Sequence, residues 1–223
     1  MDYTMKVVIT GANRGIGLAL TLSYLEQNAQ VIAVCRHASE ELKQSSATII
    51  DGIDVSNPET LSRLTDHLQR QSVDILINNA GVLAVENINE PSPATIEQQF
   101  RVNALGPLLV TQALLDNLNK GSKIAMITSR MGSISDNGSG GYYGYRMSKA
   151  ALNAAGHSIA KDLHSRGIAV VMLHPGYVQT EMVGYGGDID AATSATRLQQ
   201  RISELSLDSS GDFFHSNGQR LPW

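Results

Sequence analysis

The sequence has one cysteine, Cys35, and one tryptophan, and aromatic residues make up only 5% of its 223 residues. A single cysteine cannot form a disulfide within the chain, so we expect a fold without such cross-links and a reducing cytoplasm as its location. Cys35 ends the apolar run Ile-Ala-Val-Cys. This setting predicts a small buried side chain rather than a reactive thiol.

Excess positive charge and long apolar runs are also missing. The 17 Lys and Arg residues are outnumbered by 21 Asp and Glu residues, for a net charge of −4. An acidic surface attracts neither nucleic acids nor anionic membranes. No apolar run approaches the ~20 residues that a membrane-spanning helix needs. No cluster of Cys and His or of spaced carboxylates indicates a metal site. We therefore expect no nucleic acid, membrane or metal partner.

What the sequence does have is an alternation of short β-branched runs with longer stretches of helical period. The strand-like runs are nearly all apolar, as expected for parallel strands covered on both faces. They occupy residues 6–10, 30–35, 47–51, 75–78, 123–128 and 169–173, with a last strand at Phe213-Phe214. Helical patterns occupy residues 15–26, 59–71, 95–117, 145–164 and 191–205. This order predicts an α/β fold with a doubly wound parallel sheet of about seven strands flanked by helices.

No internal repeat, linker or shift in composition divides the chain, so we predict one domain over residues 1–223. The first ten residues run directly into the first apolar strand, which we interpret as a strand and not as a signal peptide. The stretch 132–144 is rich in Gly and Ser and precedes the helix at 145–164. A loop in this position is predicted to form a wall of the functional site.

A glycine-rich turn joins the first predicted strand to the first predicted helix. It reads Thr-Gly-Ala-Asn-Arg-Gly-Ile-Gly over residues 10–17. Glycines permit a tight turn and a close approach of the backbone to a pyrophosphate, and a helix N-terminus favours an anion. A plain turn would also use glycine, but the strand–turn–helix context favours a dinucleotide site of the Rossmann type. The predicted cofactor-binding residues of this turn are Gly11, Asn13, Arg14, Gly15, Ile16 and Gly17.

The residue after the second predicted strand bears on the choice of cofactor. An NAD-binding site usually has a carboxylate there, which accepts a hydrogen bond from the ribose 2′-hydroxyl. This sequence has Arg36 at that point and no acidic residue before Glu40. Arg36, joined by Arg14, would instead pair with a 2′-phosphate through bidentate hydrogen bonds. We therefore expect NADP(H) as the preferred cofactor, with NAD(H) as the alternative if Arg36 is only a solvated residue at a strand end.

Tyr145 and Lys149 are four residues apart in a predicted helix, so their side chains lie on one face. A free tyrosine has a pKa near ~10 and is a poor acid or base at neutral pH. A neighbouring cation favours the phenolate, so we expect Lys149 to lower the pKa of Tyr145. The alternative is a surface tyrosine that lies over a lysine stem. Tyr142 and Tyr143 have no lysine one turn later.

With Asn78-Asn79-Ala80-Gly81 after the fourth strand, the order of motifs resembles the short-chain dehydrogenase/reductase family. The match covers nearly the whole chain, and its order and spacing are highly specific. The motifs that carry it are residues 10–17, 54–55, 78–81, Asn103, Ser129, residues 145–149, 175–176 and Thr180. Residues 129–134, 145–149 and the terminal Leu221-Pro222-Trp223 are similar to one subgroup, the C-factor-like and sniffer-like carbonyl reductases, which are mostly NADPH-dependent.

The resemblance implies a catalytic role for four residues. Tyr145 would donate its proton to the substrate carbonyl oxygen during reduction. Ser129 would hydrogen-bond that oxygen and stabilise its developing charge. Lys149 would bind the nicotinamide ribose and, together with the oxidised cofactor, lower the pKa of Tyr145. Asn103 would hold a water that links Lys149 to bulk solvent.

The resemblance also extends the cofactor site. Asp54 and Val55 would contact adenine, Asn79 to Gly81 would shape the cofactor bed, and the segment after the sixth strand would steer the nicotinamide carboxamide. The cofactor-binding residues implied in this way are Asp54, Val55, Asn79, Ala80, Gly81, Tyr145, Lys149, Pro175, Gly176, Val178 and Thr180.

Several of these positions have a structural alternative. Asn103 could kink or cap a helix, and Thr180 could cap a short helix before Glu181. Ser129 could cap a strand end, with Ser133 as the true substrate contact. His174 precedes a proline at a strand end, and we interpret it as a structural residue.

We therefore expect an NADPH-dependent oxidoreductase that reduces an aldehyde or ketone to the alcohol, with Tyr145 as the general acid. The alternative is a nucleotide-binding signalling or regulatory protein of C-factor type with little or no catalysis. The short glycine-containing segment after Thr180 predicts a modest lid and an open site for small or tolerant carbonyl substrates. The resemblance implies a homodimer or homotetramer, and Leu105, Leu108, Leu109 and Leu152 could serve an interface or the core. The physiological substrate does not follow from the sequence.

Overall fold

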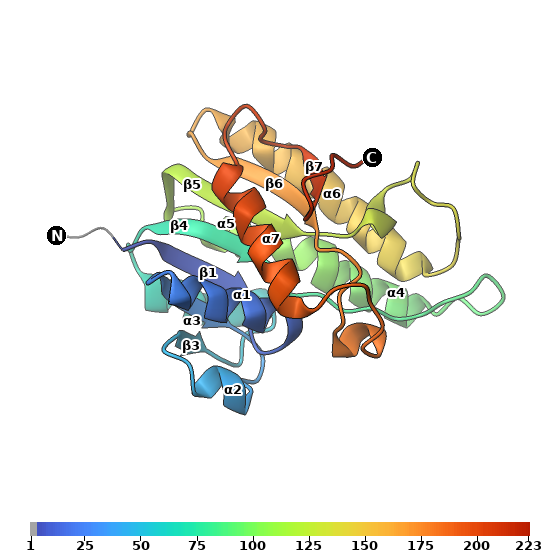
Figure 1. Ribbon diagram of the computed structural model, residues 1–223, viewed down its shortest axis with the longest axis horizontal. Coiled ribbons are helices and arrows are strands. Elements are labelled where there is room, and N and C mark those ends of the chain that lie inside the picture. The colour runs from blue at the N-terminus through green and yellow to red at the C-terminus, as the bar shows by residue number, and fades with distance from the viewer. Residues whose placement is uncertain (1–3) are drawn as a thin grey trace.

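Seven parallel strands form one sheet in the order β3-β2-β1-β4-β5-β6-β7 (Figure 1). The structure, a computed structural model, describes residues 4–223, so residues 1–3 of the predicted domain lie outside the described residues. The strands are β1 (Lys6–Thr10), β2 (Gln30–Val34), β3 (Thr48–Ile50), β4 (Val73–Asn78), β5 (Leu118–Ile127), β6 (Ala169–His174) and β7 (Phe213–His215). The order reverses between β1 and β4, which pair directly. Ligands of doubly wound sheets bind at this reversal, outside the carboxyl ends of the strands.

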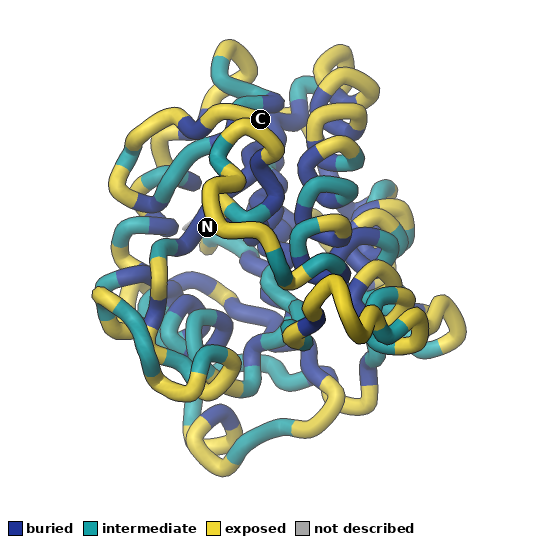
Figure 2. Tube along the Cα trace, turned by 90° about the vertical axis from the view of Figure 1, so that its right-hand side faces the viewer, coloured by how far each residue is buried: buried dark blue, intermediate teal, exposed yellow. Residues whose placement is uncertain are grey.

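Helices cover both faces of the sheet. They are α1 (Gly15–Glu26), α2 (Glu40–Lys43), α3 (Pro58–Leu68), α4 (Pro93–Phe100), α5 (Gly106–Ala113), α6 (Tyr143–His164) and α7 (Ala191–Glu204). α1 and α7 pack on one face with Val7 and Ile9. α3, α5 and α6 pack on the other face with Val8. Successive side chains of a strand point to opposite faces, so apolar residues at every strand position fill two separate cores. Figure 2 shows the buried residues gathered in the interior and the exposed ones in the loops around it.

The predicted sheet and its helix alternation are confirmed, but the predicted helix at 95–117 is wrong in its continuity. α4 starts earlier, at Pro93, because proline is tolerated in a first helical turn and Ser92 caps it. A π-helical turn, η1 (Arg101–Leu105), then separates α4 from α5, and the N–H of Gly106 bonds to the carbonyl of Arg101 five residues earlier. Pro107 has no N–H for the carbonyl of Asn103, so a regular helix cannot continue through this point.

Other boundaries shift for local reasons. α3 ends at Leu68 because Gln69 adopts a left-handed φ of 48°. α2 is too short to leave a periodic pattern, and the sequence analysis missed it. Of the four leucines considered for an interface or the core, Leu152 is buried and Leu109 packs against the same core, whereas Leu108 is 41% exposed. Within residues 4–223, no helix has the length and apolar content needed to cross a membrane.

Candidate active site

A cleft of about 440 Å³ lies at the carboxyl ends of the strands, where the strand order reverses. The glycine loop, the ends of β2 and β4, α6 and the segment after β6 all contribute to its walls. The predicted residues that line it are Gly11, Asn13, Arg14, Gly15, Ile16, Gly17, Arg36, Asp54, Val55, Asn79, Ala80, Gly81, Tyr145, Lys149, Pro175 and Thr180. One cleft therefore brings together residues that the sequence spreads from position 11 to position 180.

The glycine loop forms the floor of this cleft and leaves no room for side chains. A Cβ atom on Gly17 would lie 2.2 Å from the carbonyl oxygen of Gly11. Gly11 has a φ of +65°, and a Cβ there would lie 2.8 Å from the Cα of Ala80. The side-chain amide of Asn79 donates to the carbonyls of Thr10 and Gly11 at 3.0 and 3.2 Å, which ties the loop to the end of β4. The bare backbone and the start of α1 fit the pyrophosphate of a dinucleotide.

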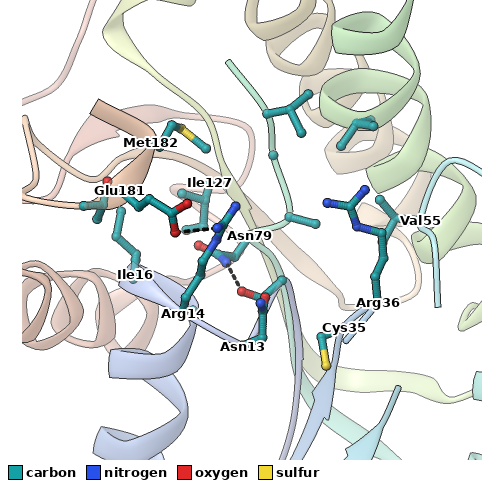
Figure 3. A pocket seen from close by; sticks show the side chains of 18 of the residues that line it. Asn13, Arg14, Ile16, Cys35, Arg36, Val55, Asn79, Ile127, Glu181 and Met182 are labelled. Atoms are coloured by element: carbon teal, nitrogen blue, oxygen red, sulfur yellow. Dashed lines mark hydrogen bonds and ion pairs between the residues drawn. The ribbon is translucent and has the colours of Figure 1, made fainter. Parts of the chain in front are cut away.

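Two arginines line the cleft in different places. Figure 3 shows Arg14 directed toward Glu181 and Arg36 on the other side of the cleft. Arg14 and Glu181 form an ion pair at 2.5 Å, and both side chains are more than half exposed. Glu181 begins the 3-10 turn η3 (Glu181–Val183), which lies in the segment after Thr180 for which the sequence predicts a lid. The two arginines therefore do not act as one preformed pair, and Arg14 bridges the glycine loop to the lid.

Tyr145, Ser129 and Lys149 meet at the inner end of the cleft. The Tyr145 side chain lies beside that of Ser129, which follows β5 and favours the phenolate form. Lys149 lies one turn along α6, with its Nζ 5.7 Å from the centre of the Tyr145 ring. The Lys149 ammonium donates to the carbonyl of Ile127 at 2.9 Å. Tyr145 and Lys149 are 9% and 4% exposed. The predicted shared face is confirmed, and the surface alternative for this pair is wrong.

The expected lowering of the Tyr145 pKa does not hold in this structure. Burial raises the pKa of Tyr145 to about 12, and the side chain of Ser129 opposes this only in part. Burial also lowers the pKa of Lys149 to about 8. Low-dielectric surroundings disfavour the charged form of each group. The phenol therefore stays protonated and neutral, and the ammonium loses its proton at a lower pH than that of a free lysine. Desolvation therefore outweighs the attraction between the lysine and a phenolate.

Ser129 has a capping role, and its contact with the substrate oxygen stays a prediction, since Ser129 itself is not among the residues that line the cleft. Its hydroxyl accepts from the N–H of Met131 at 3.1 Å, which caps the 3-10 turn η2 (Arg130–Gly132). The same side chain lies beside Tyr145. Ser133 is buried and its hydroxyl accepts from the N–H of Asp136 instead. The position beside Tyr145 therefore belongs to Ser129.

Asn103 lies behind the cleft wall and does not line it. Its side chain is fully buried in the π-helical turn η1. The amide oxygen accepts from the N–H of Val82, and the amide nitrogen donates to the carbonyl of Val82 and the hydroxyl of Ser148. A Cβ on Gly81 would lie 3.3 Å from the Asn103 oxygen and 3.6 Å from Lys149 Nζ. Asn103 thus joins the loop after β4 to α6 directly beside the lysine, and its part in proton supply stays a prediction.

After β6, only some of the residues predicted to bind the cofactor line the cleft. Thr180 lines the cleft and approaches the glycine loop, since a Cβ on Gly15 would lie 3.2 Å from its methyl group. Gly176 and Val178 do not line the cleft. Gly176 turns the chain with a φ of +100°, and Val178 is buried through its bridge to Ile189. Their contact with a cofactor stays a prediction that the cleft lining does not support.

His174 is buried, as a structural role requires. Its ring packs edge-on against His215, with 4.8 Å between the ring centres. Burial lowers the pKa of His174 to about 3, so it is neutral near pH 7. Cys35 is also buried, as predicted. Among residues 4–223, no group of three or more His, Cys, Asp or Glu side chains could hold a metal ion.

The sequence analysis missed several residues that line the cleft. They are Val34, Cys35, His37, Ile53, Val82, Val102, Ile127, Thr128, Gln179, Glu181, Met182 and Tyr185. Most stand at the carboxyl ends of parallel strands or just after them, and that placement could have been inferred from the predicted strand ranges. Glu181, Met182 and Tyr185 belong to the lid, whose path no pattern in the sequence indicates.

Two curated proteins resemble this chain in sequence. One is the 1-hydroxy-2-glutathionyl-2-methyl-3-butene dehydrogenase of Rhodococcus sp. (strain AD45), 34% identical over 97% of this chain and 99% of its own length. The other is the C-signal protein of Myxococcus xanthus, 45% identical over 68% of this chain and 93% of its own length. The resemblance to C-factor-like proteins is thereby confirmed.

Two solved structures share the whole fold. The NADPH-bound carbonyl reductase from chicken fatty liver superposes with a TM-score of 0.89 at 28% identity, over 100% of both chains. The carbonyl reductase Sniffer of Drosophila melanogaster superposes with a TM-score of 0.89 at 30% identity, over 99% of this chain and 100% of its own. The family model for short chain dehydrogenases matches residues 5–188. The chain therefore belongs to the short-chain dehydrogenase family of NAD(P)-dependent oxidoreductases.

Proposed function

We propose that this protein is an NADPH-dependent carbonyl reductase that converts an aldehyde or ketone to the alcohol. One observation carries the proposal: Tyr145, with Ser129 beside it and Lys149 one turn away, lies at the inner end of a cleft whose floor is a bare glycine loop. A proton donor and a dinucleotide cradle thus share one cleft. In this proposal NADPH supplies the hydride.

Tyr145 is the proton donor of the proposed reaction. Because burial raises its pKa to about 12, the phenol stays protonated across the physiological range. A protonated phenol can give its proton to a carbonyl oxygen as negative charge develops there. The same pKa makes the phenolate scarce near neutral pH, which favours reduction over oxidation. Ser129 would bind the same oxygen and stabilise its charge.

Lys149 positions the cofactor ribose and supports Tyr145. An ammonium group has three donors. The Ile127 carbonyl uses one of them, which leaves donors for ribose hydroxyls. With a pKa of about 8, Lys149 is still mostly charged at pH 7. Asn103 would keep Lys149 connected to solvent past the turn at Gly81, where both side chains lie close to the position that a Cβ on Gly81 would take.

The preference for NADPH rests on the basic side chains of the cleft. Arg36 stands after β2, where a carboxylate would favour NAD(H), and Arg14 lines the same cleft. Guanidinium groups bind phosphate through paired hydrogen bonds. The similar carbonyl reductase from chicken fatty liver binds NADPH. NAD(H) remains the alternative cofactor.

The substrate end is open and partly apolar. Met182 and Tyr185 line the cleft from the lid and are 44% and 70% exposed. Gly184 and Gly187 give this segment backbone freedom, both with positive φ values. A short lid with exposed apolar side chains suits small or varied carbonyl compounds.

The test is the consumption of reduced cofactor by the purified protein over a panel of aldehydes, ketones and diones. NADPH and NADH are compared side by side, with Tyr145→Phe as the control variant. Turnover with NADPH that disappears in the variant supports the proposal. Turnover that persists in Tyr145→Phe would remove Tyr145 as the proton donor.

The second candidate function is signalling, and the similarity to the C-signal protein favours it. A signalling protein of this kind would bind the dinucleotide with little or no turnover. Tight binding of NADPH without turnover over the whole panel would support this candidate. The grouping of Ser129, Tyr145 and Lys149 at one end of the cleft makes catalysis the first choice.

A further inference from the structure

Helix α6 carries Tyr145 and Lys149, yet its N-terminus lacks the usual local cap. The N-cap residue is Tyr142, whose side chain makes no capping hydrogen bond. Tyr142 also has a left-handed backbone, with φ 53° and ψ 42°. Left-handed conformations of bulky residues cost free energy and persist only where the surroundings hold them. Something outside the helix must therefore fix the start of α6.

Glu86 makes the missing contacts, from 58 residues before Gly144 in the chain. Its backbone carbonyl accepts from the N–H of Tyr142 at 3.0 Å. Its side-chain Oε2 accepts from the N–H of Gly144 at 3.1 Å. Glu86 therefore holds the strained residue and the first turn of α6 at once, and a carboxyl group at this end is also favoured by the helix dipole.

The other carboxyl oxygen of Glu86 is anchored on α4. Oε1 accepts from the side-chain amide of Gln99 at 2.5 Å and from the hydroxyl of Thr95 at 3.1 Å. The Gln99 oxygen in turn accepts from the N–H of Ala84 at 2.9 Å. Glu86 and Gln99 are only 4% and 1% exposed. All the polar atoms of this small network are paired, so loss of one partner leaves a buried group unsatisfied.

The backbone of α6 has no freedom to slide at this point. α4 and the start of α6 lie side by side (Figure 1), and a Cβ on Gly144 would lie 3.0 Å from the Cα of Ile96 and 2.4 Å from the Gln99 amide. Gly144 directly precedes Tyr145, whose side chain must reach Ser129 at the end of β5. A displacement of the first turn of α6 is therefore passed to Tyr145 with no intervening residue.

We propose that Glu86 is a positioning residue for Tyr145: by binding the N–H groups of Tyr142 and Gly144 and anchoring to Gln99 and Thr95, it sets the placement of the proton donor against Ser129. Glu86 does not line the cleft, so it acts through α6 and not on the substrate. The catalytic consequence rests on the proposed reductase function, whereas the structural consequence for α6 does not.

The central experiment compares Glu86→Gln with the exchange variant Glu86→Gln/Gln99→Glu. In Glu86→Gln, an NH₂ group replaces one carboxyl oxygen. This NH₂ group then faces another donor, either the N–H of Gly144 or the side-chain amide of Gln99. The exchange variant keeps one carboxyl group and one amide in the network. The amide oxygen at position 86 can then accept from the N–H of Gly144, and the carboxyl group at position 99 can accept from the amide at position 86 and from the N–H of Ala84. Glu90→Gln, at an exposed position of the same loop, is the matched control.

Four quantities are measured: kcat with saturating NADPH, the Kd of NADPH, amide hydrogen exchange over residues 142–147, and the ¹³C resonance of Tyr145 Cζ, assigned with Tyr145→Phe. We expect Glu86→Gln to lower kcat by about tenfold to a hundredfold, since small displacements of reacting groups have effects of this size. Exchange should be faster at the start of α6, the Tyr145 resonance should shift, and the Kd should change little. The exchange variant should restore all of these, and Glu90→Gln should alter none.

An unchanged kcat in Glu86→Gln would overturn the proposal. So would equal losses in kcat and cofactor affinity, which indicate general unfolding, or a kcat that stays low after exchange protection returns. If the wild type shows no turnover, the reductase proposal fails separately, and the exchange and ¹³C data alone decide whether Glu86 positions Tyr145. If Glu86→Gln does not fold, Thr95→Val removes one bond of the network and should cause smaller changes in the same direction.

Discussion

The two ends of the cleft are built in opposite ways. At the inner end, Tyr145 and Lys149 are almost wholly buried, as is Asn103 behind the cleft wall. The Lys149 ammonium donates to the Ile127 carbonyl, and the Asn103 amide binds the loop after β4. At the outer end, Arg14 and Glu181 pair in solvent with side chains 62% and 60% exposed. Buried polar groups have no water to replace a lost partner, whereas exposed charges do. In the proposed reaction, proton transfer would therefore occur where packing fixes the geometry, and the cofactor would first bind where charged side chains can exchange partners.

This comparison predicts the largest effect at the inner end. Tyr145→Phe should lower kcat by about 10³-fold, because it removes the proton donor while keeping the ring that packs in the site. The Kd of NADPH should stay within a few-fold of the wild type. The measurement is single-turnover reduction of an aldehyde together with cofactor titration. A kcat within tenfold of the wild type would show that the buried end does not hold the acid.

The glycine floor should come next in size. In Gly17→Ala, the new Cβ would meet the Gly11 carbonyl at 2.2 Å, so the loop must move and cofactor affinity should fall on the order of a hundredfold. Gly138→Ala is the matched control, because no atom lies within 4 Å of its Cβ position. The measurement is the Kd of NADPH for both variants, determined by fluorescence titration. Equal affinities for the two variants would mean that the close packing of the loop is not needed.

At the outer end, Arg36 should decide the choice of cofactor. Arg36→Asp removes a cation and adds an acceptor for a ribose 2′-hydroxyl, so the ratio of kcat/KM for NADPH over NADH should fall on the order of 50-fold. Steady-state kinetics with both cofactors measure this ratio. An unchanged ratio would identify Arg36 as a solvated residue at a strand end.

As pH rises, kcat for reduction should respond to the titration of Lys149 at a lower pH than to that of Tyr145. The pKa of Lys149 is lowered to about 8 and that of Tyr145 is raised to about 12. As pH rises through 8 the ammonium loses its proton, while the phenol keeps its own, so kcat for reduction should fall up to about tenfold per pH unit above that value. In Lys149→Arg the side chain keeps its positive charge, so kcat should no longer fall as pH rises through this range. A flat rate from pH 7 to 10 in the wild type would contradict the lysine assignment.

The smallest effect is expected for the exposed ion pair. Glu181→Gln frees Arg14 from the lid, and exposed pairs contribute about 0–1 kcal/mol, so affinity for NADPH and the rate of its release should change less than about fivefold. High salt should weaken NADPH binding in both proteins by screening the arginine–phosphate attraction, and it should make the difference between wild type and variant smaller. Stopped-flow measurement of cofactor release at two ionic strengths tests this. A change as large as that of Gly17→Ala would remove the distinction between the two ends.

Much of the inner end of the cleft could be predicted, because the sequence patterns that indicate it involve residues close together in the chain. Tyr145 and Lys149 share a face through helical spacing alone, and the glycines of residues 11–17 follow from the strand–turn–helix pattern. The direction of the Tyr145 pKa could not be predicted, since it depends on burial by residues distant in sequence. The same holds for Gly176 and Val178, which the turn after Pro175 takes out of the cleft lining.

The sequence by itself determined the α/β fold, because apolar period and turn residues act over a few neighbours, and it indicated the family through the order and spacing of its motifs. Only the tertiary structure decided that Pro107 breaks the long helix into a π turn around Asn103, that Glu181 holds Arg14, and that Glu86 caps α6. Each of these contacts depends on how layers pack in space. The letters of a sequence specify which groups are present, but burial and long-range pairing decide which protonation states and partners those groups adopt.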